Sequence, residues 1–254
     1  MPPDTSPASA PAFLRDVEAC YVNLLQAAGQ ATRDASDGEP SLGGRLLYAG
    51  ELDDAGRTLT VAGNIAGAAT LAATADGATQ KQSIRDGVAD FLVTTLDEAL
   101  RILKNEIRRR ATVAVCVGTA PDAVEHEMHE RGVVPDLLRL AVADVRARPI
   151  QSDDSVAPAI LLEWEVTAAP GVWMRKLDVI ARACINAGDS AAGRWLRLSP
   201  RYAGRAAQGV RVLRCARLAA QMFFETVEAQ IAEGEIGTDV RIRIGDAEQT
   251  LRRS

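Results

Sequence analysis

Apolar and polar residues alternate in two distinct patterns through the middle of the chain. Short apolar runs that end at glycine or a polar residue predict strands, and the longer segments after them carry apolar positions at helical spacing. The run at 112–117 is almost entirely apolar and stops at Gly118, which is typical of a parallel strand buried on both faces. The predicted strands are 45–49, 90–94, 112–117 and 133–138, and the predicted helices are 78–87, 96–110 and 120–131.

Strands that alternate with helices in this way predict an α/β fold. Each strand–helix–strand unit closes in the right-handed sense and places its strands parallel. We therefore predict a Rossmann-like, doubly wound parallel sheet over residues 44–148. Within it, Thr95 and Glu98 have the spacing of a capping box and predict that a helix begins at residue 96.

The segments on either side have a different texture. Residues 1–11 consist mostly of Pro, Ser and Ala without a period and predict a disordered tail, whereas 12–43 predict an N-terminal helix and a loop. The stretch around 147–158 breaks all periodicity, so we place a boundary there and predict a mainly helical region over 149–254. Its expected helices are 172–187, 190–198 and 200–233, with strands at 160–167 and 240–244.

The charge balance and the cysteine pattern narrow the choice of partner and location. The chain has 254 residues, with 29 Lys and Arg against 34 Asp and Glu, and its net charge of -5 argues against nucleic acid as the partner. The four cysteines are far apart and form no CxxC pair, which favours reduced thiols over a disulfide framework or a zinc site. No apolar run reaches the roughly 18 residues of a membrane span, and the start lacks the basic-then-apolar order of a signal peptide. We expect a cytoplasmic protein that does not bind a membrane.

Two clusters of polar residues could carry chemistry, but each has a simpler interpretation. His126 and His129 lie one helical turn apart and could bind a metal, yet no third ligand accompanies them; we favour a solvated charged helix and assign no metal site. A set of arginines after residue 190 could bind phosphate or an acidic partner, although a solvated or interface face of one helix is favoured. These are Arg194, Arg197, Arg201, Arg205, Arg211, Arg214 and Arg217.

The first turn of the predicted sheet bears on nucleotide binding. In a dinucleotide site, a glycine turn lets backbone N–H groups at a helix start meet the pyrophosphate, and an acidic residue after the second strand holds the ribose. Here the turn runs from Gly50 to Gly56 and lacks the GxGxxG pattern. Asp53 and Asp54 within it would repel a diphosphate unless they point outward or cap the helix.

A set of short sequences follows in a fixed order between residues 48 and 138. They are Ala49-Gly50, Asn64-Ile65-Ala66-Gly67-Ala68, Leu71-Ala72-Ala73-Thr74-Ala75-Asp76, Leu96-Asp97-Glu98-Ala99-Leu100, 113–118 and 130–137. Together they resemble the NAD-binding domain of urocanase (urocanate hydratase). The resemblance implies a Rossmann-like domain with a tightly bound NAD+, which in that family acts as an electrophile toward an imidazole substrate while water adds to it. Carried onto this chain, it implies the cofactor-binding residues Gly50, Gly56, Asn64, Gly67, Thr74, Asp76, Gly118 and Thr119.

Several positions depart from the urocanase pattern. Residues 51–57 replace a glycine-rich turn, and Thr74 stands where the family has an acidic residue, which leaves Asp76 as the local carboxylate for a ribose. Gly118-Thr119 replaces Gly-Asn but still offers a hydroxyl and a backbone N–H, and Leu138-Arg139-Leu140 replaces a polar stretch. We find no match to the large substrate core of the family, so we do not expect a complete urocanate hydratase.

Two hypotheses about function follow. In the first, the chain is a stand-alone urocanase-like domain that binds NAD+ or a related nucleotide; if it is an enzyme, it is related to the hydro-lyases or acts with a partner chain. In the second, it is a non-catalytic structural or interaction module that kept the fold and lost the cofactor. Its C-terminal helices would then contact a partner chain or a second copy, although their large apolar residues more often pack against a sheet. These are Trp173, Trp195, Met222, Phe223 and Phe224. We predict no catalytic residue.

Overall fold

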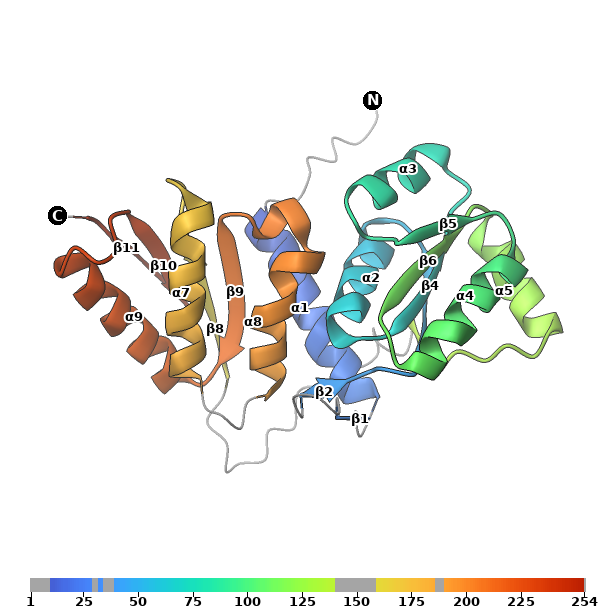
Figure 1. Cartoon of the computed structure of the whole chain (residues 1–254), viewed down its shortest axis with the longest axis horizontal. Helices are drawn as coiled ribbons and strands as arrows, with labels where there is room; N and C mark the ends of the chain where they lie inside the picture. The colour runs from blue at the N-terminus through green and yellow to red at the C-terminus, as the bar shows by residue number, and fades with distance from the viewer. Residues whose placement is uncertain (1–9, 29–31, 34–38, 140–158, 186–189, 254) are drawn as a thin grey trace.

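The computed structural model describes residues 10–28, 32–33, 39–139, 159–185 and 190–253, and it contains two larger β-sheets with helices around each (Figure 1). Most of the predicted tail and the predicted boundary near residue 148 lie outside these residues. Helix α1 (Ala10–Ala27) lies between the two sheets. Within the described ranges, no helix combines the length and the apolar character that crossing a membrane requires.

The first sheet has five parallel strands in the order β5-β6-β4-β3-β7, which confirms the predicted Rossmann-like class. Its strands are β3 (Leu46–Glu51), β4 (Ala69–Ala73), β5 (Phe91–Val93), β6 (Val113–Val117) and β7 (Leu137–Leu138). Strands β3, β4 and β6 are buried along nearly their whole length, as expected for parallel strands covered on both faces. A short ladder precedes the sheet and is formed by β1 (Thr32–Arg33) and β2 (Pro40–Ser41).

Strand β7 is shorter than the predicted 133–138. Val134 is 85% exposed, and Pro135 has no N–H to donate to a ladder, so neither residue extends the strand. The Asp136 carboxylate instead accepts a hydrogen bond from the Leu46 backbone N–H at 2.8 Å, which ties this segment to β3. The strand therefore begins only at Leu137.

Helices cover both faces of the parallel sheet. They are α2 (Asp54–Ala66), α3 (Gly77–Arg85), α4 (Leu96–Arg109) and α5 (Pro121–Glu130). Helices α4 and α5 lie on one face, α2 lies on the other with α1 packed against it, and α3 lies beside β5. Thr95 caps α4 as predicted, because its Oγ1 accepts from the Glu98 N–H at 3.3 Å. The predicted capping box is incomplete, since the Glu98 carboxylate accepts from the N–H of Thr94, the residue before the cap, at 3.1 Å.

The C-terminal region contains two of its three predicted helices, as α7 and α8, and a second sheet. Its four strands are antiparallel, in the order β11-β10-β8-β9. The elements are β8 (Ile160–Glu165), α7 (Pro170–Cys184), α8 (Ser190–Tyr202), the 3-10 helix η1 (Gly204–Ala207), β9 (Val210–Cys215), α9 (Arg217–Ala232), β10 (Val240–Ile244) and β11 (Ala247–Leu251). The strands predicted at 160–167 and 240–244 are thus present as β8 and β10.

The single helix predicted at 200–233 is wrong, because β9 interrupts it. A Cβ at Gly209 would stand 2.8 Å from the Val166 carbonyl oxygen, so glycine lets the chain run close beside the end of β8. Val210 and Val212 are buried, and their branched side chains favour a strand. The sequence pattern favoured one shared helix face for the arginines between 194 and 217. Because β9 divides this segment, they do not share one.

Most of the large apolar residues of the C-terminal helices pack inside the molecule. Trp164 of β8 and Phe223 of α9 are at most 1% exposed, and their ring centroids are 4.8 Å apart. Trp195 is 2% exposed and donates its Nε1 hydrogen to the Val212 carbonyl. Met222 differs from these residues, since it is 45% exposed.

Helix α1 contributes to the hydrophobic core on both of its sides. Leu14 belongs to the same core cluster as Leu59 of α2 and Val212 of β9. Glu18 is 2% exposed, and its carboxylate accepts hydrogen bonds from Arg214 at 2.9 and 3.1 Å. Burial raises the pKa of Glu18 even though Arg214 opposes the shift.

Helix α2 comes close to the parallel sheet at Gly63. A Cβ at this position would lie 2.7 Å from Leu47 and 2.8 Å from Thr70, too close for ordinary contact. We expect Gly63→Ala to lower the free energy of unfolding by about 1–3 kcal/mol, because the added methyl overpacks this contact. Gly77→Ala is the control, since nothing lies within 4 Å of its Cβ position and alanine suits a helix. Urea unfolding checks this, and equal midpoints for the two variants would contradict it.

Candidate functional site

Parallel pairing brings most of the predicted binding residues to one edge of the sheet. Glu51 pairs with Ala73, and Ala73 pairs with Val117, so β3, β4 and β6 end side by side. We call the ends of these strands and the turns after them the carboxyl edge. Ligands of open α/β sheets bind at such an edge. The predicted residues that lie here are Gly50, Gly56, Thr74, Asp76, Gly118 and Thr119.

Asn64 and Gly67 lie at the other end of α2. This helix of 13 residues leads away from the carboxyl edge, and its length is about 20 Å. Asn64 is 1% exposed, and its Nδ2 donates to the Val88 carbonyl at 3.1 Å. Gly67 ends the helix with a φ of 92°, a conformation that favours glycine. The structure therefore does not bring these two residues to the predicted site.

Asp53 completes the turn between β3 and α2. Its Oδ1 accepts a hydrogen bond from the Gly56 N–H at 2.7 Å, which is the arrangement of a helix N-cap. A Cβ at Gly56 would lie 1.9 Å from the Glu51 carbonyl oxygen, so the turn requires glycine there. The sequence left open whether Asp53 points outward or caps the helix, and in the structure it caps the helix.

Arg139, which follows β7, closes the same turn from another side. Its Nη1 donates to the Glu51 carbonyl at 3.2 Å, and its Nη2 donates to Asp53 Oδ2 at 3.0 Å. Burial works against ionised Asp53, but the hydrogen bonds from Arg139 and Gly56 outweigh it and lower the pKa of Asp53. The sequence pattern assigned no role to Arg139. Its position directly after the predicted strand 133–138 could have indicated that it lies at the carboxyl edge.

The turn after β4 is held by its own side chains. Thr74 is 1% exposed, its Oγ1 accepts from the Asp76 N–H at 3.3 Å, and its carbonyl accepts from Gln80 Nε2 at 2.9 Å. Asp76 Oδ2 accepts from the hydroxyl and the N–H of Thr79 at 2.6 and 2.8 Å, and these bonds lower the pKa of Asp76. The carboxylate predicted to hold a ribose is thus the N-cap of α3.

The turn after β6 contains Gly118 and Thr119. The Gly118 N–H donates to the Val93 carbonyl at 2.8 Å, so this N–H is already used within the sheet. A Cβ at Gly118 would lie 3.4 Å from both Gln80 Nε2 and the Val93 oxygen. Both residues of the turn are partly exposed. The Thr119 hydroxyl stays a predicted ligand contact.

The carboxyl edge carries more negative than positive charge. Glu51, Asp53, Asp54 and Asp76 all lie in its turns, whereas Arg139 brings one positive charge and is paired with Asp53. Such a balance disfavours a diphosphate, which carries negative charge of its own.

Two ionisable groups beneath this edge stay neutral at pH 7. Burial, with a further contribution from Glu125, raises the pKa of Tyr48, whose hydroxyl is buried and has no hydrogen-bond partner among the described residues. Burial, with a further contribution from Glu51, raises the pKa of Cys116 to about 11. Neither group is prepared to act as a nucleophile.

The histidines of α5 form no larger cluster. His126 Nε2 lies 3.3 Å from Glu130 Oε1, and both side chains are well exposed. Among the residues that the structure describes, no group of three or more His, Cys, Asp or Glu could hold a metal ion.

The segment that carries the parallel sheet matches a known family. Residues 17–141 match the family model described as the urocanase Rossmann-like domain. This segment is a urocanase Rossmann-like domain. The match confirms the resemblance predicted over residues 48–138 and extends it through most of α1, whereas the antiparallel sheet lies outside it.

The urocanase resemblance implies a bound NAD+, but the described residues of the carboxyl edge do not fit this cofactor. A pyrophosphate at this place needs backbone N–H groups at the start of α2. The Gly56 N–H is taken by Asp53, and Asp54 adds a second carboxylate to the first turn. The acidic residue expected at the ribose, Asp76, is engaged as a helix cap.

Removing the Asp53 carboxylate should destabilise the protein. We expect Asp53→Ala to lower the free energy of unfolding at pH 7 by about 1 kcal/mol, the usual cost of losing an N-cap. Asp54→Ala, in the same turn, is the control and should change it by about 0.3 kcal/mol. Urea unfolding at pH 7 makes this comparison.

The effect of Asp53→Ala should also depend on pH. Folding lowers the pKa of Asp53, so its contribution to stability is present above the unfolded pKa and is lost as the pH falls through the folded value. The difference between wild type and Asp53→Ala should therefore shrink below about pH 4. An equal difference at pH 7 and pH 3 would contradict the charged cap.

Proposed function

We propose that the chain is a non-catalytic structural and interaction module in which a urocanase Rossmann-like domain no longer holds NAD+. In this proposal, Asp53 and Arg139 take the place that the cofactor's pyrophosphate would have at the start of α2. The observation that carries it is the hydrogen bond from the Gly56 N–H to Asp53 Oδ1 at 2.7 Å, with Arg139 on the other carboxylate oxygen.

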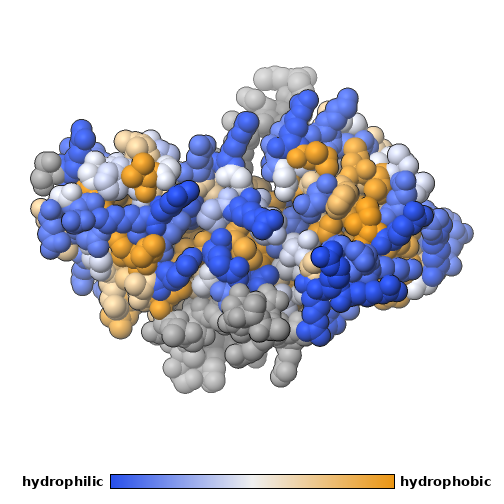
Figure 2. All heavy atoms as spheres, viewed as in Figure 1, coloured by the Kyte–Doolittle hydropathy of each residue, from blue (hydrophilic) through white to orange (hydrophobic). Residues whose placement is uncertain are grey.

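Exposed apolar residues at the outer strand of the parallel sheet support an interaction role. Phe91 and Leu92 of β5 are 48% and 41% exposed, and Ile84 of the neighbouring α3 is 40% exposed. Figure 2 shows hydrophobic atoms gathered over the region of α3 and β5. Strand edges with exposed apolar side chains are typical places for a partner to bind.

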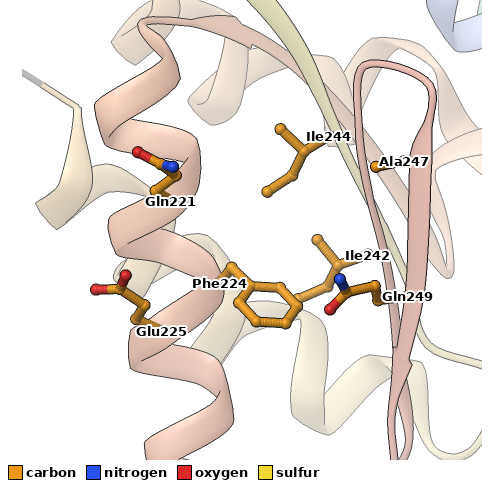
Figure 3. Close-up of a pocket in the computed structure, with 7 residues that line it drawn as sticks. All are labelled: Gln221, Phe224, Glu225, Ile242, Ile244, Ala247 and Gln249. Atoms are coloured by element: carbon orange, nitrogen blue, oxygen red, sulfur yellow. The ribbon is translucent and has the colours of Figure 1, made fainter.

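The C-terminal region offers a second surface of this kind. A hollow of about 190 Å³ lies between α9 and the hairpin β10–β11 (Figure 3). Phe224 points from α9 towards Ile242 on the hairpin, and Gln221 and Glu225 stand at the margin. Strand β11 is the outer strand of its sheet and is largely exposed, which supports contact with a partner chain or a second copy.

A second candidate function is nucleotide binding with a rearranged Arg139. Gly56 still allows the close backbone approach that a dinucleotide turn needs, and Gly118 keeps the neighbouring turn small. If Arg139 left Asp53, its guanidinium could bind a phosphate directly. In this candidate the chain would bind NAD+ or a related nucleotide, and Arg139 would be necessary for affinity.

The test is to denature the purified protein and search for released NAD+ by mass spectrometry. We expect none, because the α2 N-terminus is already occupied by Asp53. We also expect no change in melting temperature at millimolar NAD+ for wild type or for Arg139→Gln, since a ligand that does not bind the native state does not stabilise it. Stoichiometric NAD+, or a stabilisation of wild type that Arg139→Gln abolishes, would overturn the proposal in favour of the second candidate.

A further inference from the structure

Five of the seven arginines that the sequence singled out between residues 194 and 217 fall into two groups in the structure. In the first, each side chain is taken up by the protein: Arg194 donates to the Ile65 carbonyl, Arg197 pairs with Glu39, and Arg214 pairs with Glu18. In the second, Arg205 and Arg211 lie around a hollow to which α7 adds Arg175.

This hollow lies between the start of α7 and the segment formed by the end of α8 and η1, and its volume is about 470 Å³. That is within the range of small-molecule sites, about 300–1,000 Å³. Every charged residue that lines it is an arginine, and no Asp or Glu is among the lining residues. The hollow is thus cationic although the net charge of the chain is -5.

Arg211 forms a rigid floor for the hollow. It is 6% exposed, and its Nη2 and Nε donate to Asp178 Oδ2 at 2.9 and 3.2 Å. Its Nη1 donates to the carbonyls of Val210, at 2.9 Å, and Ala207. Because Asp178 balances its charge, Arg211 adds a fixed polar surface to the hollow but little net attraction for an anion.

Arg175 and Arg205 supply the net positive charge. Both are exposed at the margin of the hollow. Arg205 acts electrostatically on Asp86, whose carboxylate is also paired with Arg57 at 2.7 Å and is not among the lining residues. The first turn of α7 adds to the attraction, because Ala169 gives it no side-chain cap and the start of a helix favours anions. Gln208 offers a further polar group, and Met174 an apolar one.

We propose that this hollow binds a small phosphorylated metabolite, with the phosphate between Arg175 and Arg205 and the rest of the molecule over Met174 and Gln208. Two guanidinium groups match the several oxygens of a phosphate. The volume of the hollow and the acidic chain as a whole favour a small ligand over a nucleic acid. The site is distinct from the carboxyl edge and does not depend on the absence of NAD+ there.

The experiment measures thermal stabilisation by inorganic phosphate and by glycerol 3-phosphate at constant ionic strength, with sodium chloride, glycerol and citrate as comparison solutes. We expect saturable stabilisation by both phosphates and none by glycerol. The double variant Arg175→Gln/Arg205→Gln should raise the Kd for glycerol 3-phosphate at least tenfold. The matched control, Arg217→Gln/Arg252→Gln, removes the same charge from exposed positions outside the hollow and should leave the Kd unchanged.

Three outcomes would overturn the proposal. The first is no stabilisation by either phosphate beyond that of sodium chloride. The second is an equal loss of affinity in the double variant and the matched control, which would indicate non-specific charge. The third is saturable stabilisation by citrate alone, which would assign the hollow to carboxylates. Circular dichroism of each variant shows whether it is folded, and the single variants Arg175→Gln and Arg205→Gln replace the double variant if it is not.

Discussion

The packing of α1 between α2 and β9 is the constraint on which the rest of the structure depends. One hydrophobic core runs from the α2 side of the parallel sheet, through α1, to the antiparallel sheet. The buried Glu18 and its partner Arg214 fix the register of α1 on the second sheet. Helix α2 is therefore held on both sides, by its close contact with the parallel sheet at Gly63 and by α1.

A helix held in this way presents its N-terminus at a fixed place on the carboxyl edge. In the urocanase Rossmann-like domain of this chain, that N-terminus is satisfied from within by Asp53 and secured by Arg139. The turn after β4 is instead closed by its own Thr74 and Asp76, and the Gly118 N–H after β6 donates to Val93 of β5. Positive charge gathers at the hollow beside α7, so the anion-binding potential of the molecule lies outside the segment that matches the family.

Sequence patterns predicted the features that depend on nearby residues. The apolar run before Gly118 and the Thr95 cap depend only on neighbouring residues, and both are present where predicted. Strand β9 depends on pairing with β8 across several intervening elements, so its alternating Val and Arg were read as helix. The sequence raised Asp53 as a possible helix cap, because the capping hydrogen bond spans three residues. The contact of Asp53 with Arg139, 86 residues away, is reported by no local pattern. Asn64 was placed at the site by resemblance alone, although the length of α2 separates it from the carboxyl edge.

The most direct test of this account is an NMR titration of Asp53 together with the Gly56 amide. If Asp53 caps α2, its carboxyl carbon should titrate below the ordinary pKa of an aspartate, and the Gly56 amide proton should shift with the same midpoint. Arg139→Gln should move both midpoints upward together. An ordinary pKa for Asp53, with a Gly56 amide that does not respond, would mean that the start of α2 is open and would contradict the central claim.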